Sequence, residues 1–350
     1  MSVETAAYRF SQTQFDLLKT LAAKPGRAIS LGRLARLARV PVAQIPRALD
    51  EMERDGYVLE RGDGDKAALV SEPDWFFPER ILRGLPTAKL GRHLQAFKTI
   101  GSTNDRALLL GEKGALDGTL LVTERQTKGR GRQGRGWAAS EGKGLAFSLI
   151  LRGNLSHAQA GGLTLAAAVA LCLALEEWKV KPRIKWPNDV YLGKRKVCGI
   201  LTESRVKQDK MAFAVIGMGV NLNQEPADFP KEIRSIATSY RRHKGRPLDR
   251  LAFFHRLLHH LERCLGFVRG GQFPRILAEW RKRSYLQGRQ VRILQADRVL
   301  YGQVTGVDET GALLVRNDFG MIERILAGDV ELLRLTGRRP RGHRLKIGGS

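Results

Sequence analysis

The sequence of 350 residues contains little cysteine and histidine, which limits the metal and redox chemistry it can support. Its three cysteines, Cys172, Cys198 and Cys264, are widely separated and odd in number. This pattern argues against a disulfide framework and against a Cys-x-x-Cys metal site. Among the seven histidines, His255 and His259 have the i, i+4 spacing of metal ligands. Both lie off the apolar stripe of the helix predicted there, so we favour a solvated helix face over a metal site.

Long hydrophobic runs are also missing. The most apolar stretch, residues 163–175, is shorter than the ~20 residues needed to span a bilayer and predicts a buried helix. The first residues lack a basic segment followed by an apolar one, so we expect no signal peptide. We therefore expect a cytoplasmic protein without membrane contacts, whose length allows two or three domains.

Acidic residues are scarce: 35 Asp and Glu stand against 60 Lys and Arg, for a net charge of +25. Such an excess is typical of a protein with a polyanionic partner. The excess is unevenly distributed, because residues 1–80 contain twelve basic and twelve acidic residues and are neutral. The positive charge therefore lies after residue 80, and the first domain has no net charge with which to hold nucleic acid.

Residues 1–70 predict three short helices followed by a hairpin. A capping-box spacing at residues 11–14 begins the first helix, and Ser30 is a candidate N-cap for the second. Residues 45–52 place apolar side chains on one face of the third, and the Asp-Gly pair at 63–64 is a turn signal between two strands. This order is typical of a winged helix-turn-helix, with a small helical interaction module as the alternative.

The remainder of the chain divides by composition. Residues 71–95 are rich in proline and predict a linker with one short helix, and residues 96–285 alternate strands and helices as a mixed α/β domain does. Short strands separated by Asp and Gly turns in residues 286–336 predict a small β-barrel of five or six strands. The basic tail, residues 337–350, is expected to be disordered. The fold class expected for the whole chain is α+β.

The most unusual stretch is Gly-Arg-Gly-Arg-Gln-Gly-Arg-Gly-Trp at residues 129–137. Glycine permits close backbone approach to a ligand, and arginine donates planar forks of hydrogen bonds to phosphate or carboxylate oxygens. On composition alone, a flexible linker that touches RNA non-specifically is an equal alternative. Predicted strands at 119–126 and 144–152 hold the stretch at both ends, which favours a loop at a ligand site. We expect this loop to become ordered only when a ligand binds.

Four further segments carry polar residues at the ends of predicted elements: 101–104, 183–189, 194–201 and 216–223. The first can offer hydroxyls and amides to a small polar ring. The second ends in Asn188 and Asp189, which suit a ribose, a magnesium ion or a bound amide, and the third places Lys196 beside them. The fourth contains Gly-x-Gly-x-Asn, which permits close backbone approach but is weak evidence alone. Each segment also has a purely structural interpretation, as a helix cap, a turn, a surface basic pair or a strand end.

Together, and in this order, these segments resemble the biotin–protein ligase family over residues 97–334. The most specific matches are Ser-Thr-Asn at 102–104, the glycine-arginine loop, Lys-Trp-Pro-Asn-Asp at 185–189 and Lys-x-x-Gly-Ile-Leu at 196–201. With a winged helix at the front, the chain resembles the bifunctional bacterial members, which combine a biotin ligase with a repressor of the biotin operon. The resemblance implies a catalytic domain of the biotin/lipoate ligase type and an SH3-like C-terminal barrel.

The reaction that the resemblance implies has two steps. Biotin and ATP, with Mg²⁺, give biotinyl-5′-adenylate and pyrophosphate. The acyl group then passes to one lysine of a biotin carboxyl carrier domain, such as that of acetyl-CoA carboxylase. The resemblance also implies a homodimer formed through an edge of the central sheet. Operator DNA is an expected partner of the first domain, with binding that is weak or depends on dimerisation.

The resemblance also assigns roles to residues. Catalysis would depend on Arg132, Lys185 and Lys196. Biotin would be bound by Ser102, Thr103, Asn104, Gln126, Arg130, Gly131, Arg132 and Lys196. The nucleotide would be bound by Trp137, Asn188, Asp189, Asn221 and Arg334, with Asp189 also holding Mg²⁺.

The chemistry of these residues agrees with such roles. A carboxylate that approaches a nucleotide phosphate needs neutralising cations, a flat Trp137 offers adenine a stacking face, and a closed loop protects a mixed anhydride from water. Two alternatives stay open: a transcription factor whose central domain only senses a ligand, and a ligase for lipoate. Pyrophosphate release that depends on biotin or on lipoate separates the three interpretations.

Overall fold

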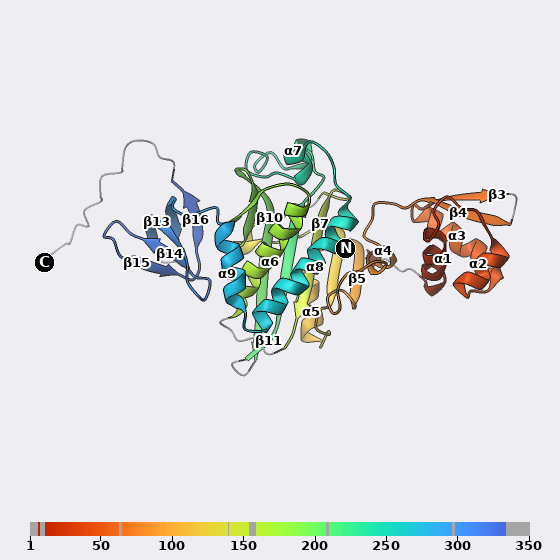
Figure 1. Cartoon of the computed structure of the whole chain (residues 1–350), viewed down its shortest axis with the longest axis horizontal. Helices are drawn as coiled ribbons and strands as arrows, with labels where there is room; N and C mark the ends of the chain where they lie inside the picture. The colour runs from red at the N-terminus through yellow and green to blue at the C-terminus, as the bar shows by residue number, and fades with distance from the viewer. Residues whose placement is uncertain are drawn as a thin grey trace.

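The computed structural model describes residues 6–7, 11–62, 65–138, 140–153, 159–207, 210–295 and 298–333. Three parts follow one another along the long axis of the molecule (Figure 1). They are an N-terminal part of helices with a three-stranded sheet, a central part around an eight-stranded sheet, and a C-terminal five-stranded sheet. In the described ranges, no helix is long and apolar enough to cross a membrane.

The N-terminal part has the predicted order of helices and hairpin. Its elements are α1 (Gln12–Ala22), β2 (Ile29–Ser30), α2 (Leu31–Ala38), α3 (Ile45–Arg54), β3 (Val58–Gly62) and β4 (Lys66–Ser71). The capping box at Ser11 is formed, and the Ser30 hydroxyl accepts a hydrogen bond from the Arg33 amide. Pro46 lies in the first turn of α3, where a missing N–H removes no helical hydrogen bond. Apolar faces of all three helices meet the sheet in one small core.

The central sheet supports the site. Its strands are β1 (Ala6–Ala7), β5 (Leu94–Ile100), β6 (Leu120–Gln126), β7 (Gly144–Leu151), β8 (Pro182–Lys185), β9 (Asp189–Leu192), β10 (Arg195–Lys207) and β11 (Lys210–Asn221). They lie in the order β1-β5-β6-β7-β11-β10-β9-β8, with β5 and β6 parallel and the remaining pairs antiparallel.

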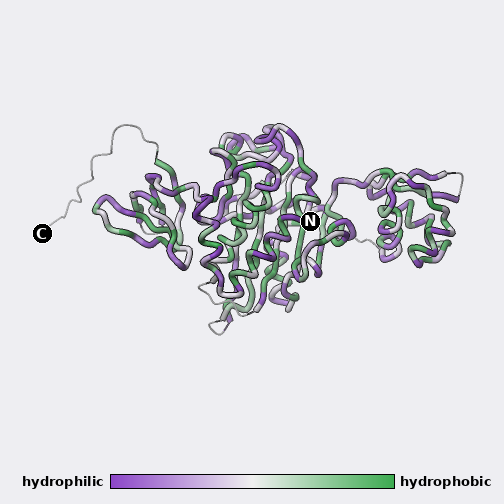
Figure 2. Tube along the Cα trace, in the orientation of Figure 1, coloured by the Kyte–Doolittle hydropathy of each residue, from purple (hydrophilic) through white to green (hydrophobic). Residues whose placement is uncertain are grey.

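Helices cover both faces of this sheet. They are α5 (Thr103–Glu112), α6 (Gln159–Glu177), α7 (Tyr240–Lys244), α8 (Arg250–Arg269) and α9 (Phe273–Lys282). Along β6, Leu120 and Val122 join the core shared with α6 and α8, whereas Leu121 joins the core under α5. This alternation follows from the two-residue period of a strand. Figure 2 shows the apolar residues gathered in the strands and helices of the central part.

The connection between the first two parts is packed onto the central part. It contains α4 (Pro78–Leu82), and Phe76 is buried in the central core. The Phe76 amide donates to Glu124 Oε1 at 2.6 Å, and Arg250 Nη1 donates to Glu124 Oε2 at 2.8 Å. Burial raises the pKa of Glu124, against the lowering effect of Arg250. Residues 71–95 were expected to be a linker, and this buried ion pair fixes the first half of that segment in place.

One prediction for α8 is wrong. His255 does not lie on a solvated face, because its Nε2 is 2.8 Å from the Ile81 carbonyl oxygen and donates to it. Burial also lowers the pKa of this ring. In the described ranges, no group of three His, Cys, Asp or Glu side chains could hold a metal ion.

The C-terminal sheet is antiparallel. Its strands are β12 (Gln290–Leu294), β13 (Val299–Val307), β14 (Leu313–Arg316), β15 (Ile322–Ile325) and β16 (Asp329–Leu332), in the order β15-β14-β13-β12-β16. Five or six strands were predicted here, and the sequence located four of them. It did not locate β15, whose Glu323 and Arg324 interrupt its apolar residues. Residues 334–350, including Arg334 and the basic tail, lie outside the described residues.

Candidate functional site

A small polar cavity forms where α5 begins over the central sheet. Ser102 caps α5 by accepting a hydrogen bond from the Asp105 amide. Gln126 Oε1, at the end of β6, accepts from the Thr103 amide at 2.8 Å and from its hydroxyl at 3.1 Å. The Asn104 amide group donates to Glu203 Oε2 at 2.9 Å. These contacts hold three hydroxyl or amide side chains together at one end of the sheet.

Ser148 completes this polar group, and the sequence analysis missed it. Its hydroxyl lies 2.8 Å from Thr103 Oγ1 and donates to Asn104 Oδ1 at 2.6 Å. The sequence feature that could have indicated this role is a single serine within the otherwise apolar strand β7. Because the side chain is fully buried, its hydroxyl needs partners, and α5 supplies them.

Glycines on β10 and β11 line the same cavity. A Cβ at Gly217 would overlap the Asn104 side chain, and one at Gly219 would overlap the Trp137 ring. The Gly-x-Gly spacing in β11 therefore serves close approach, as the sequence indicated. The cavity also contains Gly131 and Lys196 in its lining, and its volume is only about 40 Å³.

Trp137 lies in this small cavity. Its ring packs against Gly199 and Gly219, and Lys196 Nζ is 5.6 Å from the ring centre. The sequence placed Trp137 on the nucleotide side. In the structure it stands among the residues predicted to bind biotin, because the loop turns back between Gly129 and Trp137 through the hydrogen bond from the Trp137 amide to the Gly129 carbonyl.

A cationic group lies at the hairpin of β9 and β10. Lys196 Nζ is 2.7 Å from Asp189 Oδ1 across the two antiparallel strands. Lys185, at the end of β8, is half-buried, and its Nζ is 5.8 Å from the Tyr191 ring centre. Burial lowers the pKa of Lys185, and the Lys196 charge lowers it further, whereas Asp189 opposes this. Asp189 is therefore ion-paired with Lys196 and acts on Lys185 only through its charge.

Arg132 lies next to this group. Its Nη1 donates to Asn188 Oδ1 at 3.3 Å, while Asn188 Nδ2 donates to the Ile200 carbonyl at 2.8 Å. Burial lowers the pKa of the Arg132 guanidinium, and the Asp189 charge opposes this. Residues 183–189 do not form one extended strand, because a turn with a cis Trp186–Pro187 bond separates β8 from β9. This turn is what directs the Asn188 side chain at Arg132.

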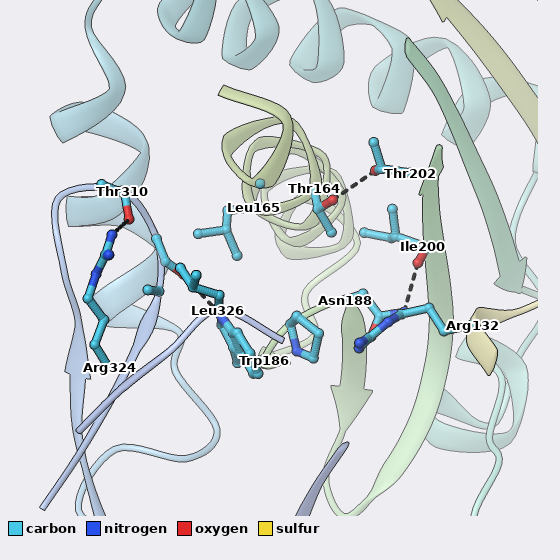
Figure 3. Close-up of a pocket in the computed structure, with 14 residues that line it drawn as sticks. Arg132, Thr164, Leu165, Trp186, Asn188, Ile200, Thr202, Thr310, Arg324 and Leu326 are labelled. Atoms are coloured by element: carbon cyan, nitrogen blue, oxygen red, sulfur yellow. Dashed lines mark hydrogen bonds between the residues drawn. The ribbon is translucent and has the colours of Figure 1, made fainter. Parts of the chain in front are cut away.

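A larger cavity of about 490 Å³ opens beside Arg132 (Figure 3). Asn188 and Ile200 lie at one end of it, with Thr164 and Leu165 of α6 above. Residues of the C-terminal sheet, Thr310, Arg324 and Leu326, lie at the other end. Trp186 Nε1 donates to the Gly311 carbonyl at 3.1 Å and so links the two parts. The C-terminal sheet therefore contributes a wall to the site.

Each arginine of the glycine-arginine loop has a different anchor. Arg130 pairs with Asp105 on α5 and Glu203 on β10, Arg132 bonds Asn188, and Arg135 pairs with Asp329 on β16. An isolated bridge between Arg130 and Gly136 closes the loop on itself. The loop is therefore held between the α5 end of the sheet and the C-terminal sheet.

The structure thus brings most predicted site residues together. Lys185 and Asp189 line neither cavity but adjoin Lys196, and the exceptions are Asn221 and Arg334. Asn221 is buried at the end of β11, accepts a hydrogen bond from Gln224 Nε2 at 3.3 Å and lines neither cavity described above. Arg334 lies outside the described residues. Ser102, Thr103, Asn104, Gln126, Arg130, Gly131, Trp137 and Lys196 line the small cavity, and Arg132 and Asn188 line the large one.

Comparisons with known proteins agree with this arrangement. Residues 96–221 match the biotin/lipoate A/B protein ligase family, and residues 287–333 match the biotin protein ligase C terminal domain. The bifunctional ligase/repressor BirA of Bacillus subtilis is 35% identical over 286 residues, which cover 81% of this chain and 87% of that protein. The biotin–[acetyl-CoA-carboxylase] ligase of Mycobacterium tuberculosis is 35% identical over 69% of this chain and 90% of its own length.

Solved structures give the same answer. The biotin protein ligase from Aquifex aeolicus, in complex with biotin and ATP, aligns with a TM-score of 0.59 and 33% identity. The alignment covers 69% of this chain and 99% of that one. The chain therefore belongs to the biotin protein ligase family.

Proposed function

We propose that this chain is a biotin–protein ligase, which activates biotin with ATP and transfers it to a lysine of a biotin carboxyl carrier domain. The observation that supports this most directly is the juxtaposition of two kinds of site. A polar cavity that suits a small ring adjoins two cations, Lys196 beside Asp189 and Arg132 beside Asn188. The two cations suit a carboxylate and a phosphate. Relatives named as a bifunctional ligase/repressor and as a biotin–[acetyl-CoA-carboxylase] ligase match most of the length of the chain, which supports the proposal.

Binding of the ureido ring is assigned to Thr103, Asn104 and Gln126, with Ser148 fixing the first two. Polar ring edges are costly to bury without partners, and these side chains offer both donors and acceptors. Gly217 and Gly219 let the ring lie close to the backbone of β11. This half of the site confers specificity.

Adenylate formation is assigned to the cations. The biotin carboxylate must approach the α-phosphate of ATP, and Lys196, Lys185 and Arg132 would offset the repulsion between the two anions. No covalent bond to the protein is needed, because positioning and charge carry the step. Asp189 holds Lys196 in place at 2.7 Å. In the second step, the acceptor lysine attacks the acyl carbon and AMP leaves.

Magnesium fits this site as a companion of the nucleotide. The Asp189 carboxylate and the Asn188 carbonyl oxygen are the ligands that Mg²⁺ prefers. Because the described residues contain no cluster of three ligands, phosphate oxygens and water would supply most of the coordination. Bound Mg²⁺ would neutralise phosphate charge.

Trp137 is proposed to move when ligands bind. With its ring in place, the small cavity has a volume of about 40 Å³, far below the ~300 Å³ of a typical small-molecule site. The ring must therefore leave before a bicyclic ligand can enter, and it then becomes available to stack on adenine. Nucleotide contacts of Asn221 and Arg334 stay predictions.

The flanking parts are proposed to be a winged helix-turn-helix (residues 1–70) and an SH3-like barrel (residues 286–336). The three helices with a hairpin and the five-stranded antiparallel sheet support these assignments. We further propose operator binding by the first domain and a homodimer formed through an edge of the central sheet. The relatives named as ligase/repressor support the first of these roles.

Pyrophosphate release tests the enzymatic proposal. Purified chain with ATP and Mg²⁺ should release pyrophosphate when biotin is added and not when lipoate is added. Release with lipoate alone would make the chain a lipoate ligase, and release with neither would favour a ligand-sensing transcription factor. Deleting residues 1–70 should leave release intact, since the connection that pairs with Arg250 begins after them.

A further inference from the structure

A cationic groove lies on the N-terminal part, away from its third helix. Its cations are Lys19 of α1, Lys24 and Arg27 of the following turn, Arg33 and Arg39 of α2, and Lys66 of β4. The groove has a volume of about 770 Å³, and no residue of α3 lines it. Asp16 is the one carboxylate in its lining, and this side chain already accepts a hydrogen bond from Gln12.

These cations have no acidic partners. Within the part of the chain that the structure describes, none of the six forms an ion pair. Like charges that converge on a concave surface repel one another unless an anion lies between them. Leu37, at 55% exposure, adds an apolar contact in the middle of the groove. The groove therefore needs an anionic partner from outside this domain.

The exposed face of α3 shows the opposite arrangement. Arg47 pairs with Glu51 at 3.0 Å, and Arg61 of β3 pairs with Asp50 at 2.7 Å and Glu53 at 2.9 Å. Arg47 and Arg61 are thus neutralised by carboxylates of α3, whereas Arg54 donates to the Asp50 backbone carbonyl. A phosphate group approaching this face would meet carboxylates beside every paired arginine.

We propose that the groove between α1, α2 and β4 is the surface of the N-terminal domain that binds the phosphate backbone of duplex DNA, whatever the base sequence that other contacts select. This inference rests on the proposed DNA-binding role of the N-terminal domain and changes which face performs it. Six unpaired cations in one groove suit a polyanion such as a duplex, on which phosphates succeed one another at ~1.7 Å of axis length. The neutrality of residues 1–80 conceals an uneven distribution: three of the twelve acidic residues lie on α3, whereas six of the twelve basic residues line the groove.

Charge reversal on each face tests the proposal. We would measure binding of the full chain to a fluorescent duplex of mixed sequence at several salt concentrations, with and without biotin and ATP. The groove variant is Lys24→Glu/Arg27→Glu/Arg33→Glu. The matched variant on the other face is Arg47→Glu/Arg54→Glu, which changes two exposed arginines of α3.

The groove variant should bind roughly a hundredfold more weakly, and the slope of log affinity against log salt should fall by about two to three. The α3 variant should change affinity by less than about threefold. Biotin-dependent pyrophosphate release should be unchanged in both variants, which separates this test from that of the ligase activity. Far-UV circular dichroism and thermal unfolding of each variant should match the wild type, which shows that the N-terminal part remains folded.

Three outcomes would overturn the inference. If the α3 variant loses more affinity than the groove variant, DNA binds the third helix, and the repressor role survives without the groove. If the wild-type chain binds no duplex at low salt, the repressor role fails as well, while ligase activity is unaffected. If polyglutamate displaces the duplex at equal charge concentration, an acidic polypeptide suffices and DNA is not the specific partner.

Discussion

The glycine-arginine loop and the cationic groove are both rich in basic residues, and they differ in the groups that lie opposite their charges. In the loop, Arg130 and Arg135 each pair with carboxylates and Arg132 bonds an amide. In the groove, the cations have no acidic partner among the described residues. Paired cations are held in position and suit a defined ligand, whereas unpaired cations suit a long anion with many equivalent phosphates. The presence or absence of ion pairs therefore distinguishes a site for a defined ligand from a surface for an extended polyanion.

The largest effect is expected at Lys196. Replacing it in Lys196→Gln removes a cation that lies 2.7 Å from Asp189 and faces the small cavity. Loss of one preorganised charge should slow adenylate formation roughly a hundred- to a thousandfold. Pyrophosphate release measures this. Lys207→Gln, on the exposed end of the same strand, is the control and should be active. DNA binding should not change in either variant, and a linked loss would show that the two surfaces are not independent.

Arg132→Gly is expected to let the adenylate escape. A charge-assisted contact contributes about 1.5–3 kcal/mol, so release should be roughly ten- to a hundredfold faster, and free adenylate would then modify lysines indiscriminately. Arg135→Gly, from the same loop, points to Asp329 and should show less release. Non-specific biotinylation of albumin reports the escape. Retention as tight as in the wild type would mean that the Asn188 contact is structural only.

The loop should be cut by trypsin in the ligand-free protein and protected by biotin with ATP. Cleavage at Arg130, Arg132 or Arg135 tests this, and equal rates with and without ligands would contradict it. Asp329→Asn should speed cutting two- to fivefold, since a partly exposed ion pair contributes only about 0.2–1 kcal/mol. Glu112→Gln, which breaks the exposed Arg205–Glu112 pair elsewhere, should have no effect.

The smallest effect is expected at the contact between the N-terminal part and α4, which connects that part to the central part. Glu79 of α4 accepts a hydrogen bond from the Tyr57 hydroxyl at 2.5 Å, and burial raises the pKa of Glu79 to about 7. The folded chain therefore keeps a proton that the unfolded chain releases near pH 4.5. The corresponding stability is present below pH 4.5 and is lost as the pH rises toward 7, by roughly 2–3 kcal/mol.

Urea unfolding at several pH values measures this pH-dependent contribution to the free energy of unfolding. In Glu79→Gln the free energy of unfolding should fall less between pH 4.5 and 7 than it does in the wild type. Glu60→Gln, which changes an exposed side chain on β3, should behave as the wild type does. If only the N-terminal part unfolds in this pH-dependent way, the N-terminal part and the central part unfold as separate units. An unchanged pH profile in Glu79→Gln would mean that Glu79 is ionised in the folded protein.

Much of the fold could be predicted because the signals were local. Capping residues, turn dipeptides and apolar periodicity fixed the helices of residues 11–54 and the strands around the glycine-arginine loop. The missed strand β15 contains Glu323 and Arg324, whose place in the sheet depends on neighbouring strands. His255 was misassigned because its partner, the Ile81 carbonyl, is 174 residues away in the chain.

The candidate site likewise has features that the sequence predicted and features that only the structure revealed. The residue types and their order determined that a polar ring and an anion could be bound, because glycine, arginine, lysine and amide side chains have fixed chemistry wherever they lie. Only the tertiary structure placed Ser148 beneath Asn104, turned Trp137 into the small cavity and joined Arg135 to Asp329. The sequence also shows that residues 1–80 carry no net charge, but only the structure places six of their twelve basic residues in one groove and three of their twelve acidic residues on α3. Charge is a property of composition, but the distance between charges is decided by packing.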